Sequence, residues 1–497
     1  MTFGTFAQPL NLDPGVINES ESAQVANNIY ETLVEYDSET NRFFPVLATG
    51  WSSSPDNKSW TFNLRRNVKF HNGTDFNAHA VKFSWDRQRV TSHPYHNPGY
   101  GRFTFYRAAW GGYPGNIKKI EVIDSHTLKV ELYYKDNNFL KIISNLPFAI
   151  VSPSAVKKFG NRFTKNPVGT GKFKFVDWRN WQRILLKANL DHWNSRPNLD
   201  YLIFEPTPGR QSRHRQISRE FVDIIENPDP QLYNLVKNRI RDHLYLMKEP
   251  GYNFSFISLN CQKPPLDIPL VRKALCFAID KNRIIKKLQA KYKNADSPVI
   301  SMFNTNIETR NQIYNPGTAR ALLKKAGFPR GFTLELLYLK SSRPFLTDQE
   351  DVAREIARDL EKVGITVNIS GLRWESYLEK LRFGVHQAAL TGFVGIDYQP
   401  EIYFQQCWAP TNAVLGGTNI SFYRNEKIQS LLTSASFTHS DSALLGDYRQ
   451  IQEILANDNP LVPLFHNHTI LCINQRVQNV KVNRKGLIDF SRVWLKK

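Results

Sequence analysis

Apolar and polar residues follow two different spacings along the chain. From about residue 40 to 165, short segments such as 59–64 and 129–133 alternate between apolar and polar residues, which is typical of half-buried strands. After about residue 255, apolar residues recur every three or four positions, as in 269–287, which predicts helices. A strand-rich region is therefore expected to precede a region that also contains helices.

A strand–helix–strand pattern is the clearest unit in the second half of the chain. Residues 333–339 and 365–369 predict strands. Thr347 and Glu350 have the spacing of a capping box at a helix start, and Gly364 stands where helices commonly end. The helix has an apolar stripe formed by Val352, Ile356, Leu360 and Val363. This order predicts a βαβ unit with parallel strands, so this half of the chain is expected to be α/β.

The loop inside this unit carries a candidate binding residue. Arg343 follows the first strand and precedes the helix, and α/β sheets bind ligands outside the carboxyl ends of their strands. A guanidinium can fork onto a carboxylate. Arg343 is therefore a candidate for holding an anionic group, and the alternative is a solvated arginine on a loop.

The start of the chain has weaker signals. Residues 2–10 predict a short strand and a turn. Residues 22–34 have a helical spacing, because Val25, Ile29 and Leu33 share one face. No stretch approaches the roughly 18 apolar residues of a membrane helix. A basic-then-apolar leader is absent, so we expect the sequence either to begin after a removed export signal or to be cytosolic, and the first is favoured.

The chain is basic, with 65 Lys and Arg against 45 Asp and Glu, a formal charge of +20. Such a field attracts nucleic acid, acidic lipid or an acidic ligand, although a basic surface that only aids solubility is the simpler interpretation. The densest basic cluster lies at residues 210–219 and contains no aromatic residue, which disfavours a groove for single strands. A nucleic-acid-associated protein stays as a distant alternative.

Residues that would mark an enzyme or a metal site are sparse. The cysteines form no CxxC pair, and their pairing is not deducible; they are Cys261, Cys276, Cys407 and Cys472. Residues 169–172 are similar to part of a P-loop, but Asn166 replaces its first glycine and Phe173 its Ser/Thr. His466 and His468 lack an identifiable third ligand. We therefore expect no catalytic residue, no metal and no cofactor.

Four long motifs occur in order along the chain: NNIYETLVEYD at 27–37, WTFNLRRNVKFHNGTDF at 60–76, NPVGTGKFKF at 166–175 and CQKPPLDIPLVRKAL at 261–275. They resemble the large peptide-type family of extracellular solute-binding proteins of ABC importers, over nearly the whole chain. Members of that family bind dipeptides, oligopeptides, nickel chelates or haem. The first motif is similar to the family's opening helix.

The resemblance implies an α/β fold with two hinge-connected lobes, of the periplasmic-binding-protein type, with an extra strand-rich subdomain. Lobe I would comprise residues 1–39, the subdomain 40–165, residues 166–256 and the C-terminal segment 466–497, and lobe II residues 257–465. Hinges are expected near 252–259 and 460–469. The ligand would sit between the lobes and favour the closed form by binding it better.

The resemblance also implies parts of the binding site. The pair Arg343-Pro344 looks equivalent to the family pair whose arginine clamps a dipeptide carboxylate. Residues 391–401 are similar to the family segment in which a tryptophan forms a wall and an aspartate pairs with the peptide amine. The ligand-binding candidates are Arg343, Phe393, Ile396, Asp397, Tyr398 and Phe6, which lies in the first predicted strand.

Residues 391–401 differ from the family segment at the position that pairs with the peptide amine. Phe393 stands in place of the tryptophan, Ile396 in place of the aspartate, and Gln399 at the next acid. A buried ammonium without a carboxylate partner costs several kcal/mol. Asp397 lies one position further and is either a substitute partner or a turn residue. The motif therefore does not establish that a free peptide amine is bound.

Together these features predict a receptor without enzymatic activity that binds a peptide or peptide-like ligand and delivers it to the permease subunits of an ABC transporter. The same receptor class with haem, a metal chelate or another anionic cargo is the alternative. A periplasmic or membrane-associated extracytoplasmic location is expected, as are a monomer and no nucleic-acid partner.

Overall fold

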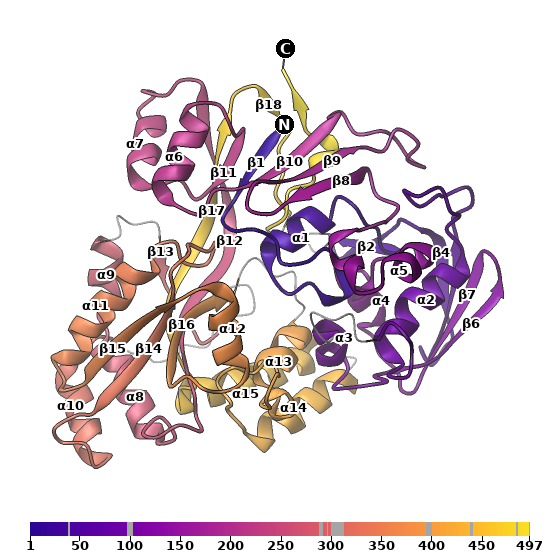
Figure 1. Ribbon diagram of the computed structural model, residues 1–497. Helices are drawn as coiled ribbons and strands as arrows, with labels where there is room; N and C mark the ends of the chain where they lie inside the picture. The colour runs from indigo at the N-terminus through magenta and orange to yellow at the C-terminus, as the bar shows by residue number, and fades with distance from the viewer. Residues whose placement is uncertain are drawn as a thin grey trace. The chain divides into compact units, whose positions relative to one another are not determined.

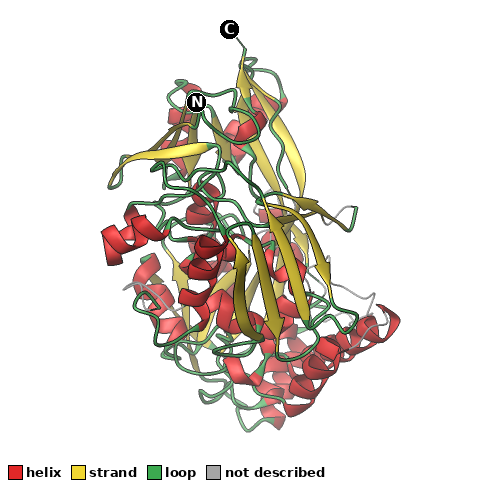
Figure 2. Cartoon of the chain, turned by 90° about the vertical axis from the view of Figure 1, so that its right-hand side faces the viewer, coloured by secondary structure: helices red, strands yellow, loops and turns green. Residues whose placement is uncertain are grey.

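The computed structural model describes residues 1–37, 40–96, 103–287, 292–295, 297–299, 313–393, 400–437, 441–483 and 486–496. The chain forms two compact units, whose elements are labelled in Figure 1. Unit 1 contains Met1–Ile225, Asn234–Leu246 and Cys472–Lys497, and unit 2 contains Glu226–Tyr233 and Met247–Leu471. Both chain ends therefore belong to unit 1. Helices and strands occur in both units, as the predicted α/β class requires, and Figure 2 shows both kinds of element.

Unit 1 contains two larger sheets. In the first, β1 is parallel to β10 and β11, and β9 pairs antiparallel with both β10 and β8. These strands are β1 (Thr2–Thr5), β8 (Phe173–Arg179), β9 (Arg183–Ala188), β10 (Tyr201–Pro206) and β11 (Ile224–Glu226). The second sheet is antiparallel, in the order β4 (Ala48–Ser53), β5 (Ser59–Leu64), β7 (Thr127–Leu132) and β6 (Ile117–Asp124). The alternating segments at 59–64 and 129–133 thus lie in β5 and β7, although β7 begins at Thr127 and ends at Leu132 instead of residue 133.

The remaining elements of unit 1 are short. The helices are α1 (Ser20–Ala26), α2 (Ala78–Arg89), α3 (Thr104–Ala109), α4 (Phe139–Ile143), α5 (Pro153–Phe159) and α6 (Arg210–Ser218). Two-stranded pairs are formed by β2 (Val34–Asp37) with β3 (Arg42–Pro45), and by β18 (Val477–Gln478) with β19 (Trp494–Leu495). Helix α7 (Pro230–Lys237) and strands β11, β12 (Leu244–Leu259) and β17 (Leu461–Asn474) contain residues of both units.

The helix predicted at residues 22–34 is wrong beyond Ala26, where α1 ends. The carbonyls of Asn28 and Ile29 accept backbone hydrogen bonds from Phe173 (3.0 Å) and Gly171 (2.9 Å). A Cβ atom on Gly171 would lie 2.7 Å from the Ile29 carbonyl carbon, which explains the glycine there. The carbonyl groups that a longer helix would use are therefore occupied by another segment, while Ile29 stays fully buried.

Unit 2 is built on a mixed sheet. Strand β14 (Thr333–Leu339) lies parallel to β15 (Thr366–Leu372) on one side and to β16 (Ala388–Phe393) on the other. Strand β12 is antiparallel to β16, and β13 (Tyr292–Asn294) is antiparallel to β17. The predicted βαβ unit is confirmed, because α11 (Gln349–Glu361) connects β14 to the parallel β15. The glycine at its end, Gly364, has a φ of +90°, which side chains disfavour.

The helices of unit 2 pack on two apolar cores. One core surrounds β14 and includes Val352, Ile356, Leu360 and Val363, the stripe predicted for α11. The other core contains Phe254 and Phe256 of β12 together with residues of α13 to α15. The helices are α8 (Pro269–Ala278), α9 (Lys281–Lys287), α10 (Pro316–Lys325), α12 (Trp374–Arg382), α13 (Pro400–Trp408), α14 (Glu426–Phe437) and α15 (Asp441–Asp458). None of the helices in the described ranges is long and apolar enough to span a membrane.

Two local predictions for unit 2 are wrong. The helix expected at 269–287 is divided into α8 and α9, because Ile279 is extended and the backbone N–H of Asp280 donates to Asp359 (2.9 Å). The capping box is not formed, because α11 begins one residue later, with Asp348 as its N-cap. The Thr347 hydroxyl instead contacts Asp348 and Tyr292.

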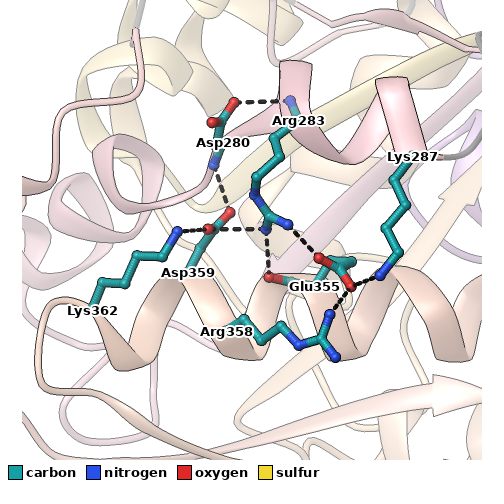
Figure 3. Close-up of polar contacts among 7 residues, drawn as sticks. All are labelled: Asp280, Arg283, Lys287, Glu355, Arg358, Asp359 and Lys362. Carbon is teal, nitrogen blue, oxygen red and sulfur yellow. Dashed lines mark hydrogen bonds and ion pairs between the residues drawn. The ribbon is translucent and has the colours of Figure 1, made fainter.

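An ion-pair network joins α9 to α11 (Figure 3). The Glu355 carboxylate, only 3% exposed, pairs with Arg283 and Lys287 of α9 and with Arg358 of its own helix. Arg283 also pairs with the buried Asp359 (3.0 Å). Burial alone would raise the pKa of Glu355, but hydrogen bonds from Lys287 and Arg283 bring it down to about 2. Glu355 is therefore ionised at neutral pH and fixes α11 against α9.

We expect Glu355→Gln to lower the free energy of unfolding by about 2–3 kcal/mol, because its cations lose a charged partner. Glu350→Gln is the matched control: this carboxylate is half exposed and pairs with the exposed Arg354, so its loss should cost less than about 1 kcal/mol. Denaturant titration of each variant measures the difference. Equal stability of the two variants would contradict a structural role for the network.

The same carboxylate predicts an acid dependence. Its pKa is about 2 in the folded chain and near its ordinary value of 4.5 when unfolded. The stability that it contributes is thus fully present above pH 4.5 and is lost as the pH falls toward 2. Between pH 5 and 2, calorimetry should show a steeper fall in melting temperature for the wild type than for Glu355→Gln. Parallel curves would be inconsistent with this assignment.

Candidate functional site

The carboxyl ends of the parallel strands of unit 2 form one edge of the sheet. The candidate binding loop was predicted at this edge. Because β14, β15 and β16 run in the same direction, the residues that follow them emerge at one edge of the sheet. The loop after β14 contains Arg343. Trp374 lies two residues after the end of β15, and Phe393 is the last residue of β16. Three segments distant in sequence therefore reach this edge: the loop after β14, the residues after β15 and the end of β16.

Backbone and side-chain hydrogen bonds hold the Arg343 loop in one conformation. Arg343 and Leu346 exchange two backbone hydrogen bonds, of 3.2 and 3.0 Å. The Ser255 hydroxyl of β12 donates to the Phe345 carbonyl (2.9 Å), and the Ser342 hydroxyl donates to the Thr347 carbonyl (2.9 Å). The loop is thus anchored both to itself and to the neighbouring sheet, so the position of Arg343 is well defined.

Arg343 is buried, with 3% of its surface exposed, so the alternative of a solvated loop arginine is wrong. Its guanidinium carbon lies 4.0 Å from the centre of the Trp374 ring, a cation–π contact. Trp374 in turn stacks on Tyr377, at 6.2 Å and 15°. Burial raises the pKa of Tyr377, whose protonated hydroxyl donates to the Leu390 carbonyl of β16 (2.9 Å). The cation is therefore held against α12, and α12 against the sheet.

Phe393 belongs to a series of aromatic contacts in unit 2. Its ring lies 5.2 Å from Phe256 and 5.4 Å from Tyr403. Phe256 stacks on Phe254 (5.1 Å), and Phe254 stacks on His466 (5.1 Å). Phe393 is only partly buried, and these neighbouring rings pack against its side chain. Its role as a ligand wall stays a prediction.

Three candidates, Ile396, Asp397 and Tyr398, lie outside the described residues. The sixth, Phe6, lies in unit 1, directly after β1, and is 2% exposed. The guanidinium carbon of the buried Arg213 lies 4.5 Å from its ring. Arg213 also donates to the Thr207 carbonyl (3.4 Å), just beyond β10. Phe6 is therefore a core residue of unit 1 that supports a buried cation.

The cysteines and histidines of the described ranges give no sign of a reactive or metal-binding site. All four cysteines are free, and burial raises the pKa of Cys276 to about 12, which keeps its thiol protonated. No group of three His, Cys, Asp or Glu residues suited to a metal ion occurs among the residues that the structure describes. His466 is engaged with Phe254, as above.

The sequence analysis missed Trp374 and Gln349 at this edge. Gln349 is the first residue of α11, and its Oε1 accepts a hydrogen bond from the backbone N–H of Leu339 (3.1 Å). Trp374 follows β15 by two residues. A polar or aromatic residue just after a parallel strand is a candidate site residue. The sequence shows this signal after β15 as well, but it was used only for the loop after β14.

Comparison with known proteins shows the family to which the chain belongs. The family model of the bacterial extracellular solute-binding proteins, family 5 Middle, matches residues 42–414, about three quarters of the chain. The chain belongs to this family of bacterial extracellular solute-binding proteins, which confirms the resemblance seen in the motifs.

Individual relatives are distant in sequence but similar over their length. The dipeptide-binding protein of Escherichia coli K12 is 29% identical over 480 residues, covering 94% of this chain and 88% of the relative. Heme-binding protein A of Haemophilus influenzae is 29% identical over 488 residues, covering 95% and 88%. The ABC transporter-associated periplasmic binding protein DppA of Helicobacter pylori, solved with the peptide STSA, is 27% identical with a TM-score of 0.91, covering 100% and 98%. The predicted fold class is thereby confirmed.

The burial of Phe6 allows a direct test of its role. We expect Phe6→Ala to lower the free energy of unfolding by about 3–4 kcal/mol, because it leaves a cavity beneath Arg213. The matched control is Phe221→Ala, also in unit 1, where the ring is 63% exposed and its removal should cost little. Denaturant titration measures both variants. A Phe6→Ala protein as stable as the wild type would contradict the core role.

Proposed function

We propose that the chain is the solute-binding receptor of an ABC importer, which binds a peptide or peptide-like ligand and delivers it unchanged to a membrane permease. The observation that carries the proposal is the buried Arg343, held by a rigid loop at the carboxyl edge of parallel strands. A guanidinium shielded from water binds a carboxylate more strongly than an exposed one, because water competes less. Every free peptide carries such a carboxylate at its C-terminus.

The relatives support the peptide class of cargo. The Escherichia coli relative is named a dipeptide-binding protein, and the Helicobacter pylori structure holds a four-residue peptide. Aromatic side chains such as Phe393 would contact ligand side chains with little selectivity, while charged groups hold the ligand's ends. Arg343, Phe393, Ile396, Asp397 and Tyr398 therefore remain the proposed ligand contacts. Phe6, which is buried in unit 1, also stays a proposed ligand contact.

A second cargo class has its own support. The Haemophilus influenzae relative is named for haem, and the formal charge of +20 favours anionic ligands. Haem carries two carboxylates that a buried arginine would also bind. Native mass spectrometry of protein purified without added ligand distinguishes the two, because a carried-over peptide and a haem differ in mass and in absorbance.

We also propose that the protein acts as a monomer outside the cytoplasm, performs no catalysis and does not bind nucleic acid as its main role. Strongly salt-dependent binding to unrelated DNA would argue against the last point. Turnover of a bound peptide, followed by mass spectrometry, would argue against the receptor role.

Replacing Arg343 tests the proposed site. Arg343→Ala should weaken binding of a dipeptide such as Ala-Phe by about 1.5–3 kcal/mol, because a charged hydrogen-bond partner is lost. Arg343→Lys keeps the charge but not the forked geometry, so its affinity for the dipeptide should lie between those of the wild type and Arg343→Ala. The matched control is Arg354→Ala, since Arg354 is exposed and pairs with Glu350 on α11.

Titration calorimetry measures these affinities, and circular dichroism confirms that each variant is folded. The C-terminal amide of Ala-Phe lacks the carboxylate, so its affinity should depend little on Arg343. If folded Arg343→Ala bound Ala-Phe as tightly as the wild type, Arg343 would have no place in the site.

A further inference from the structure

Two side-chain donors near Arg343 are shielded from solvent and have no hydrogen-bond acceptor among the residues that the structure describes. They are the amide nitrogen of Gln349 and the indole nitrogen of Trp374. Gln349 is 3% exposed, so water does not reach it freely. Nearly all buried donors in folded proteins have an acceptor, since leaving one unpaired costs free energy. Two such donors lie beside a buried cation at one edge of the sheet, where an acceptor on another molecule would pair with them.

The location of both donors follows from backbone pairing. Leu339 ends β14 and Leu372 ends β15, and the two residues are partners in the parallel register. The amide of Gln349 accepts from the Leu339 N–H, so its nitrogen also lies at the end of β14. Trp374 follows Leu372 by two residues, and its ring lies against the Arg343 guanidinium at 4.0 Å. Both donors and the cation are therefore at the same edge of the sheet.

The two donors are independent of the groups that hold the loop. The loop is fixed by the backbone of Arg343 and Leu346 and by hydroxyl groups of Ser255 and Ser342. The fold at this edge thus does not require the Trp374 N–H. The Oε1 atom of Gln349 has a structural partner, but its amide nitrogen has none.

We propose that Gln349 and Trp374 are specificity-determining residues, which donate hydrogen bonds to an oxygen of the cargo carboxylate that Arg343 binds. This inference rests on the proposed function. A carboxylate offers two oxygens that only accept, whereas a carboxamide turns one of these positions into a donor. Donors facing donors are left unpaired, so the site selects an acid over its amide and over neutral ligands of the same shape.

Single substitutions remove each donor; the one at Trp374 changes little else, and the one at Gln349 also adds a charge. Trp374→Phe removes the N–H and keeps a ring beneath Arg343. Gln349→Glu keeps the oxygen that accepts from Leu339 and replaces the donor with an acceptor. The matched control is Trp60→Phe in unit 1, because the Trp60 indole nitrogen is also buried without an acceptor but lies on β5, in another sheet.

Calorimetry with Ala-Phe and Ala-Phe amide gives the binding readout. Trp374→Phe should bind Ala-Phe roughly tenfold more weakly, and Gln349→Glu more weakly still because its charge repels the carboxylate. The amide should bind the wild type and Trp374→Phe about equally, and Trp60→Phe should match the wild type. Without ligand, Trp374→Phe should melt no lower than the wild type.

Unchanged affinity of Trp374→Phe for Ala-Phe would overturn the inference, as would a marked loss of its stability without ligand. Failure of the proposed function gives a different result. If the wild type binds haem but not Ala-Phe, the peptide assignment fails, while weaker haem binding by Trp374→Phe still supports the donors. If the wild type binds neither carboxylate ligand, both proposals are overturned.

Discussion

Glu355 sits at the centre of the interactions that orient α11. Its buried carboxylate pairs with two cations of α9 and one of α11, and the neighbouring Asp359 pairs with Arg283 and accepts from the backbone at Asp280. Burying an ionised carboxylate without these partners would cost free energy. The ion pairs therefore hold α9 and α11 together at any pH at which Glu355 is ionised. Helix α11 begins after the loop that carries Arg343, so the position of this loop depends on the network that holds the helix.

The proposed binding edge combines the buried Arg343 cation with aromatic side chains that pack against it. Arg343 rests on Trp374, and Trp374 on Tyr377, whose hydroxyl is tied to the backbone of β16. Such a stack orients the guanidinium and lowers the entropy that it loses on binding. A receptor for varied ligands needs affinity from groups that all of them share, and a terminal carboxylate is such a group. In the proposed site, the aromatic residues around Phe393 would add contact area without strong selection.

Unit 1 depends on close approach of backbone segments. The segment around Gly171 bonds to the carbonyls of Asn28 and Ile29, and no side chain fits between them. Phe6 and Arg213 add a buried cation–π contact beside the parallel strands β1 and β10. The glycine-containing motif at 166–175 therefore has a structural explanation in this unit and needs no phosphate-binding role.

Local patterns determined a good part of this protein. The period of two placed β5 and β7, the strand–helix–strand order predicted the parallel pair β14 and β15, and the loop between strand and helix singled out Arg343 before any contact was known. These features follow from backbone geometry and from the burial of one face, which neighbouring residues encode. The tertiary structure alone decided where helices stop and which side chains lie beside Arg343. Helix α1 ends because residues 171–173 take its carbonyls, α8 ends because Asp359 takes a backbone N–H, and Trp374 reaches Arg343 only because β15 pairs with β14. Each of these is a contact between residues distant in sequence, and no local spacing records it.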